Sequence, residues 1–157
     1  MRILILSDSH GNKAALQKIL MRHCDIKEIF FLGDCVKDIE GLKDSFADRV
    51  FHIVSGNCDP FSTALSSDIC AIGGIKIFYT HGHRFFVKGG YNSLIEAARL
   101  RGCTLAICGH THIPYTTYDN GVYLVNPGSV SLPRDGKASY AIADIVESGI
   151  SVSIMTV

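Results

Sequence analysis

Two histidines separated by one residue, His110 and His112, follow an apolar run at residues 104–108 and a glycine. Residues i and i+2 of an extended chain point to the same side, so both imidazoles can face one point beyond the end of the run. Imidazole is the commonest metal-binding side chain, although a lone pair of histidines near a turn is weak evidence. The spacing nevertheless makes this segment a candidate metal site.

Four more apolar runs, at residues 1–6, 29–32, 50–54 and 75–79, also end in residues with oxygen or nitrogen donors. Five of the seven histidines occur in such motifs, whereas chance would scatter them along the chain. Their imidazoles, two carboxylates and one amide are too many ligands for one ion of ordinary coordination number, but suit two ions. The candidate ligands are Asp8, His10, Asp34, Asn57, His81, His110 and His112.

The elements that must position these side chains begin with an alternation of strands and helices. Apolar runs at 2–6, 28–32 and 50–54 read as buried strands. An amphipathic helix from Asn12, a good N-cap, to residues 23–24 and a shorter helix over 38–46, interrupted at Gly41, lie between them. This order predicts a parallel sheet with right-handed crossovers. Ligands of such a sheet collect outside the carboxyl ends of its strands.

The rest of the chain predicts a second, mixed sheet. A hairpin over 68–79 turns at two glycines, and a helix over 91–101 ending at Gly102 precedes the buried strand at 104–108. Four alternating runs, at 116–118, 121–125, 139–146 and 150–156, indicate an antiparallel meander or a pair of hairpins. We therefore expect one domain over residues 1–157. Its fold class is α/β, a two-sheet α/β/β/α sandwich with mixed parallel and antiparallel strands.

Composition favours a small substrate over a polyanion. Fifteen acidic and fifteen basic residues cancel, and no basic run indicates a nucleic-acid surface. The opening apolar run is too short for a signal peptide, and no apolar stretch has the length of a membrane span. We expect a cytoplasmic protein. In that reducing compartment, cysteines without a CxxC pair are expected to be small buried residues, namely Cys24, Cys70, Cys103 and Cys108.

The joint pattern resembles the calcineurin-like metallophosphoesterase superfamily over essentially the whole chain. The motifs, in the order of that family, are Asp8-x-His10, Gly33-Asp34, Gly56-Asn57-x-Asp59, His81 and Gly109-His110-x-His112. The small size and the segments at 57–59, 80–83 and 126–129 most resemble its bacterial and archaeal phosphodiesterases. The retromer subunit, which uses the fold as a protein scaffold, is a related member.

This resemblance implies a ligand assignment and a reaction. Asp8, His10 and His112 would hold one divalent ion, Asn57, His81 and His110 the other, and Asp34 would bridge them. The donors favour Mn²⁺, with Ni²⁺, Fe²⁺, Zn²⁺ or Mg²⁺ as alternatives. A hydroxide bridging the two ions would attack phosphorus.

The resemblance therefore predicts a metal-dependent phosphodiesterase acting on a small phosphodiester. We expect no nucleic-acid partner other than a small nucleotide substrate, and no membrane partner. The protein could form a homo-oligomer. The alternatives are a non-catalytic protein-binding scaffold and a phosphomonoesterase. A purely structural metal fits poorly, because structural sites are closed by four Cys or His ligands.

Four residues are candidates for catalysis: Asp34, Asn57, Cys58 and His83. Many members of the superfamily carry a proton-donating histidine after the asparagine ligand, where this chain has Cys58. We therefore expect a preference for activated or aryl diesters. His83 could replace that donor, orient a ligand, or be a plain turn residue.

Several neighbouring residues have two interpretations each. Cys35 and Cys58 adjoin candidate ligands, and nearby cations would lower their pKa values and favour oxidation. Asp38 and Asp59 could support ligands or serve as surface caps, Asp38 as a helix N-cap. The segment at 126–129 could line the site or only connect strands, and Arg134 could meet a substrate phosphate or remain in solvent.

Overall fold

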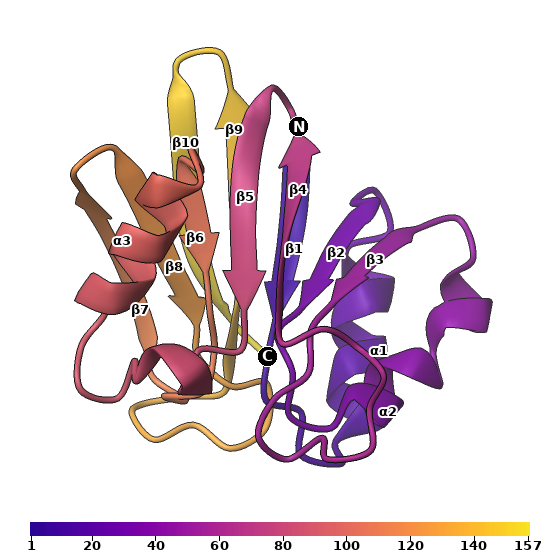
Figure 1. Ribbon diagram of the computed structural model, residues 1–157. Coiled ribbons are helices and arrows are strands. Elements are labelled where there is room, and N and C mark those ends of the chain that lie inside the picture. Colours follow the sequence, from indigo (N-terminus) through magenta and orange to yellow (C-terminus); the bar gives the residue numbers. More distant parts are fainter.

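A computed structural model describes all 157 residues and contains two five-stranded sheets packed face to face (Figure 1). The strand order of the first sheet is β10-β9-β1-β2-β3. Its parallel strands are β1 (Arg2–Leu6), β2 (Glu28–Phe31) and β3 (Val50–Ile53), as the β-α-β pattern predicts. The hairpin of β9 (Ser139–Val146) and β10 (Gly149–Thr156) extends this sheet antiparallel to β1.

The second sheet has the order β4-β5-β6-β8-β7 and is mixed. Its three inner strands, β5 (Ile75–Thr80), β6 (Leu105–Ile107) and β8 (Val122–Pro127), are parallel. The edge strands β4 (Ser67–Ile72) and β7 (Pro114–Asp119) each form a hairpin with an inner neighbour. The last four strands are therefore two hairpins in different sheets, which decides between the two predicted arrangements.

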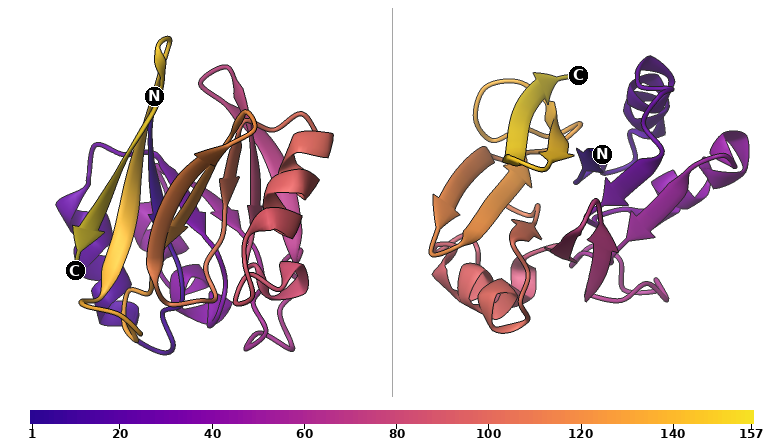
Figure 2. Two further views of the ribbon diagram at one scale, coloured as in Figure 1. Left: turned by 90° about the vertical axis from the view of Figure 1, so that its left-hand side faces the viewer. Right: turned by 90° about the horizontal axis from the view of Figure 1, so that it is seen from above.

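Helices cover the outer faces of the two sheets. Helices α1 (Lys13–Arg22) and α2 (Val36–Glu40) lie outside the first sheet, and α3 (Asn92–Leu100) lies outside the second (Figure 2). The α/β/β/α sandwich expected from the sequence is confirmed.

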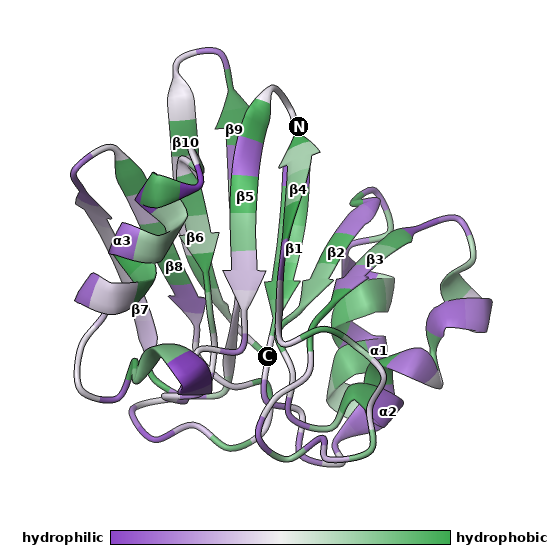
Figure 3. Cartoon of the chain, in the orientation of Figure 1, coloured by the Kyte–Doolittle hydropathy of each residue, from purple (hydrophilic) through white to green (hydrophobic).

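Alternation along the strands divides the apolar side chains into three layers. Ile3 and Ile5 of β1 belong to the cluster between the sheets, whereas Leu4 and Leu6 pack beneath α1 and α2. A third cluster lies under α3. Figure 3 shows the strands as mainly hydrophobic and the loops below them as more polar. Burial of both faces explains why the β1 and β2 sequences are continuous apolar runs.

The helix predicted over 38–46 differs from the structure. It begins earlier, as α2, and after Gly41 a separate 3₁₀ turn covers Lys43–Phe46. Asp38 is not its N-cap, a position that Cys35 occupies. The Asp38 carboxylate instead accepts hydrogen bonds from Ser9 Oγ (2.7 Å) and Gly11 N (2.8 Å), and so fastens α2 to the loop after β1.

Other local predictions have mixed outcomes. Asn12 is the N-cap of α1, as expected, and its side chain accepts from Ala15 N. Cys103 and Cys108 are buried, but Cys24 is exposed and Cys70 only half-buried, because Cys24 lies beyond the end of α1 and Cys70 on an edge strand. None of the helices is long and apolar enough to cross a membrane.

Candidate metal centre

The loops that carry the seven candidate ligands lie along one edge of the sandwich, the lower edge in Figure 1. Each follows the carboxyl end of a parallel strand, where loops of both sheets meet. The loops after β1, β2 and β3 carry Asp8, His10, Asp34 and Asn57, and those after β5 and β6 carry His81, His110 and His112. Parallel pairing within each sheet thus brings together residues that are up to 104 positions apart.

The first donor cluster consists of Asp8, His10, Asp34 and His112. One ligand atom from each lies within 4.8 Å of the others. The Nε2 atoms of His10 and His112 are 3.2 Å apart, and Asp34 Oδ2 lies 3.7 Å from His10 Nε2. Both carboxylates are buried, which is costly for negative charge unless a positive charge compensates it.

Asp8 Oδ1 tests whether this cluster suits a cation. The atom is buried, no donor hydrogen-bonds to it, and His112 Nε2 lies 3.1 Å away. His112 Nδ1 donates to the carbonyl of Leu132 (2.7 Å), so in the neutral ring Nε2 presents a lone pair. Asp8 Oδ1 and His112 Nε2 are then both acceptors, and they attract each other only when a proton or a cation lies between them. The donor set therefore fits a divalent metal ion.

The pKa values agree with a site for positive charge. Burial alone would raise the pKa of Asp8, but His112, His81 and Ser7 lower it overall. The Asp8 carboxylate raises the pKa of His112, mainly through the contact at Oδ1. A proton on His112 or a cation between these two atoms would compensate the buried Asp8 carboxylate.

The second donor cluster consists of Asn57, His81 and His110. His81 Nε2 lies 3.1 Å from His110 Nδ1 and 3.2 Å from Asn57 Oδ1. The Leu32 carbonyl accepts from His81 Nδ1 (2.7 Å), which leaves Nε2 free to ligate. Burial, His81 and Lys88 lower the pKa of His110 to about 4, so its ring is neutral at physiological pH and can ligate.

Asp34 lies between the two clusters. Its Oδ2 atom faces His10 Nε2 of the first cluster at 3.7 Å, and its Oδ1 atom lies 3.4 Å from His81 Nε2 of the second. Cys58 N donates to Oδ1 (2.9 Å) and holds the carboxylate in this orientation. A carboxylate with one oxygen toward each donor set is the arrangement that a bridging ligand needs.

The backbone around the ligands is unusual. Five of the seven ligand residues have positive φ: Asp8 (56°), His10 (44°), Asp34 (60°), His110 (70°) and His112 (60°). Non-glycine residues seldom adopt this left-handed region, at a cost of about 1–3 kcal/mol each. Such strain concentrates at functional sites, where the surrounding structure fixes the side-chain directions.

Two glycines allow the loops of this edge to approach one another. A Cβ atom at Gly109 would lie 1.9 Å from Ser7 Oγ, and one at Gly56 would lie 2.1 Å from Asp34 Oδ1. Both distances are far below any van der Waals contact. Each glycine therefore makes room for a ligand carboxylate or for the hydroxyl group that supports it.

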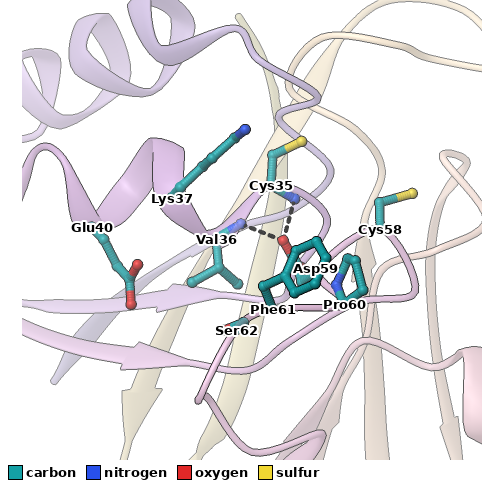
Figure 4. Close-up of a pocket in the computed structure, with 9 residues that line it drawn as sticks. All are labelled: Cys35, Val36, Lys37, Glu40, Cys58, Asp59, Pro60, Phe61 and Ser62. Carbon is teal, nitrogen blue, oxygen red and sulfur yellow. Dashed lines mark hydrogen bonds between the residues drawn. The ribbon is translucent and has the colours of Figure 1, made fainter.

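Asp59 has a larger role than the sequence indicated. Its carboxylate accepts four backbone N–H bonds at 2.8–2.9 Å, from Asp34, Cys35, Val36 and Gly56. Figure 4 shows the carboxylate facing the start of α2. Asp59 thus ties the Asp34 loop to the Asn57 loop. In the sequence, only the spacing Gly56-Asn57-x-Asp59 indicated that Asp59 belongs to the site.

Hydrogen bonds from the end of β8 and the loop after it support the ligand loops. Asn126 Nδ2 donates to Gly109 O (2.8 Å) and Thr111 Oγ1 (2.9 Å), and Ser129 Oγ donates to Asp8 O (2.8 Å). Residues 126–129 therefore hold the centre together rather than only connect strands. Ser7, whose hydroxyl donates to Asp8 Oδ2 (2.5 Å), escaped sequence analysis because a serine beside a strand end carries no distinctive pattern.

His83 and the two thiols also lie at the centre. The His83 ring is 5.3 Å from that of His81 and 6.1 Å from that of His110, and its Nδ1 atom is buried without a partner. Burial and Asp34 raise the pKa of Cys58 to about 11, and burial raises that of Cys35. The protein's own groups thus act against the expected lowering of these thiol pKa values.

Two hollows flank the ligand loops. The first, of about 230 Å³, is lined by Cys35 and Cys58, next to Asp34 and Asn57 (Figure 4). The second, of about 560 Å³, is lined by Thr111, which stands between His110 and His112. The first hollow is lined by α2 and the loop after β3, and the second by the segment before α3, the segment around Thr111 and the connection from β8 to β9.

Comparison with known proteins identifies the family. A family model described as "Calcineurin-like phosphoesterase superfamily domain" matches residues 1–148. The chain is 31% identical over 154 residues to the "Probable metallophosphoesterase YsnB" of Bacillus subtilis, covering 97% of this chain and 89% of that protein. It is 27% identical over 168 residues to "Phosphodiesterase YfcE" of Escherichia coli, covering 92% and 88%. The chain belongs to the calcineurin-like phosphoesterase superfamily.

Solved structures share the fold. A predicted phosphoesterase from Streptococcus pneumoniae superposes with a TM-score of 0.84 at 26% identity, over 99% of this chain and 88% of that one. A Vps29 variant from Entamoeba histolytica superposes with a TM-score of 0.77 at 24% identity, over 99% and 98%. These solved structures therefore share the two-sheet sandwich of this chain.

Proposed function

We propose that the protein is a metal-dependent phosphodiesterase with two divalent ions at the edge of the sandwich. The single observation that carries this proposal is the Asp34 carboxylate, with one oxygen toward each donor cluster. Asp8, His10 and His112 would hold one ion, Asn57, His81 and His110 the other, with Asp34 bridging. Mn²⁺ is the proposed occupant, because the donors are imidazole nitrogens with carboxylate and amide oxygens.

When bound, a pair of such ions activates a water molecule as the nucleophile and stabilises charge on the phosphoryl oxygens. Attack forms a new P–O bond and breaks the bond to the leaving group. The chain's own residues position these events. Leu32 and Leu132 fix the tautomers of His81 and His112, and Cys58 N orients the Asp34 carboxylate.

Diester hydrolysis is favoured over monoester hydrolysis by the two hollows. A phosphodiester has two organic arms, and a hollow lies on each side of the ligand loops to receive them. A monoester would fill one hollow only. The name of the relative "Phosphodiesterase YfcE" points in the same direction.

His83 is the proposed partner of the leaving-group oxygen. It lies beside both imidazoles of the second donor cluster, and burial lowers its pKa, so its neutral ring would donate a hydrogen bond rather than a proton. The Cys58 thiol, with its raised pKa, is also a weak proton donor. Diesters whose leaving groups depart without protonation, such as phenolates, are therefore the best substrates.

The test combines metal content with two substrates. Parent protein loaded with Mn²⁺ should retain two ions per chain, and His112→Ala and His81→Ala should each retain fewer. The parent should hydrolyse bis(4-nitrophenyl) phosphate faster than 4-nitrophenyl phosphate. Preference for the monoester would indicate a phosphomonoesterase. Two ions without hydrolysis of either substrate would favour a non-catalytic scaffold, an alternative that the fold shared with Vps29 supports.

Replacing Cys58 with histidine tests the leaving-group assignment. Cys58→His restores a proton donor, so hydrolysis of diphenyl phosphate, a poor substrate, should rise by about 10²-fold. Hydrolysis of bis(4-nitrophenyl) phosphate should change little, because nitrophenolate needs no proton. Cys58→Ser, the control, should behave as the parent on both. Equal gains of Cys58→His on both diesters would contradict the assignment.

A further inference from the structure

The larger hollow beside the metal centre has a composition of its own. We call it the aromatic cleft; Lys88, Gly90, Tyr91, Thr111, Tyr115 and Arg134 are among its lining residues. Its volume of about 560 Å³ is within the range of small-molecule sites. The cleft borders the loop that carries the candidate ligands His110 and His112, because Thr111 lies between them in the sequence.

Two basic side chains give the aromatic cleft a positive charge in a chain whose net charge is zero. Lys88 and Arg134 are exposed, neither forms an ion pair, and no lining residue is acidic. Arg134 N donates to the carbonyl of His112 (3.1 Å), and Lys88 lines the same cleft as Thr111. Both residues therefore border the loop that carries His110 and His112.

The smaller hollow has the opposite character. It contains one lysine, Lys37, and two acidic residues, Glu40 and Asp59. An arm of the substrate that carries additional negative charge would be repelled there and attracted to the aromatic cleft. The two sides of the metal centre thus discriminate between the two arms of a diester.

The aromatic residues add a flat surface to the charged one. The rings of Tyr91 and Tyr115 are parallel, with centroids 4.9 Å apart and an interplanar angle of 6°, and Tyr115 is 44% exposed. Asn126 Nδ2 lies 3.3 Å from the Tyr91 hydroxyl and also bonds Thr111, which links this pair to the His110–His112 loop. Stacked, exposed aromatic side chains bind planar rings such as nucleobases.

We infer that the aromatic cleft binds a nucleotide arm of the substrate, with its base against Tyr115 and a further phosphate beside Lys88 and Arg134. This inference rests on the proposed function, because the reacting phosphodiester must lie at the metal centre. It makes the substrate a small phosphorylated nucleotide ester rather than a simple alkyl or lipid-type diester.

Three esters with the same leaving group test the inference. They are methyl 4-nitrophenyl phosphate, thymidine 5′-(4-nitrophenyl phosphate), and the latter with a 3′-phosphate. The kcat/KM of the parent should rise along this series, by roughly tenfold for the base and by roughly tenfold for the second phosphate. Each step is the ratio of two kcat/KM values of one protein. Lys88→Gln/Arg134→Gln should abolish the second step, and Tyr115→Leu should reduce the first.

The matched control is Lys18→Gln/Lys43→Gln, which removes two exposed lysines that line neither hollow and should keep both steps. A flat series in the parent, or equal loss of all three rates in the cleft variants, would overturn the inference. Binding of thymidine 3′,5′-bisphosphate, measured by calorimetry, separates it from the proposed function. If the parent binds this compound and the cleft variant does not, the assignment of the cleft as a nucleotide site is supported even if the protein hydrolyses no diester. If neither protein binds it, the assignment is wrong.

Discussion

Asp34→Asn is expected to lower kcat for bis(4-nitrophenyl) phosphate by about 10²–10³-fold, because the charge between the two donor clusters is lost. The variant should fold normally. Asparagine keeps an oxygen that can accept the hydrogen bond from Cys58 N. Without metal, its Tm should equal or exceed that of the chelated parent, because Asp8 and Asp34 no longer repel each other inside one cluster.

Thermal unfolding with and without Mn²⁺ distinguishes this prediction from general destabilisation. Mn²⁺ should raise the Tm of the parent, since a ligand that binds only the folded state stabilises it. The same addition should raise the Tm of Asp34→Asn much less. A variant that unfolds early without metal would show general destabilisation. One that keeps both the full Mn²⁺ response and full activity would show that Asp34 does not bridge two ions.

Asp59→Ala is expected to destabilise the protein by about 3 kcal/mol, because four backbone N–H groups lose a charged acceptor at once. Activity should fall as well. The loops that carry Asp34 and Asn57 are joined to each other through this side chain. Urea unfolding of the two proteins measures the free-energy difference, and hydrolysis of bis(4-nitrophenyl) phosphate measures the second effect.

Asp59→Asn serves as the comparison, since it keeps one acceptor oxygen and removes the charge. Its free energy of unfolding should lie between those of the parent and Asp59→Ala. A loss below about 1 kcal/mol in Asp59→Ala would indicate that water replaces the carboxylate at these N–H groups, and that the loops are held by other contacts.

The fold was largely predictable because its signals are local and repeated. Continuous apolar runs marked β1, β2 and β5, and the alternating runs near the carboxyl end marked the two late hairpins. Which sheet each hairpin joins was not predictable, since it depends on long-range pairing of β9 with β1. The start of α2 was misplaced, because Asp38 looks like a cap in sequence but bonds to a distant loop.

The residues of the site also differ in how far the sequence could predict them. The candidate ligands could be named because donors at strand ends form a visible motif, and the structure brings all seven to one edge. The segment at 126–129 was visible as a motif, but the partners of Asn126 and Ser129, up to 121 positions away, were not. Ser7 supports its neighbour Asp8 and belongs to no distinctive motif. Asp59 is intermediate: its motif was visible, but its four backbone partners were not.

Each donor cluster takes ligands from both halves of the sandwich. His112 joins three residues of the first sheet, while Asn57 joins two residues of the second. Cations held there would therefore cross-link the two sheets at the edge of the sandwich, where the apolar core between the sheets ends. Loading with metal would then contribute to the cohesion of the whole molecule. The chemistry of the centre and the mechanical integrity of the fold would depend on the same few atoms.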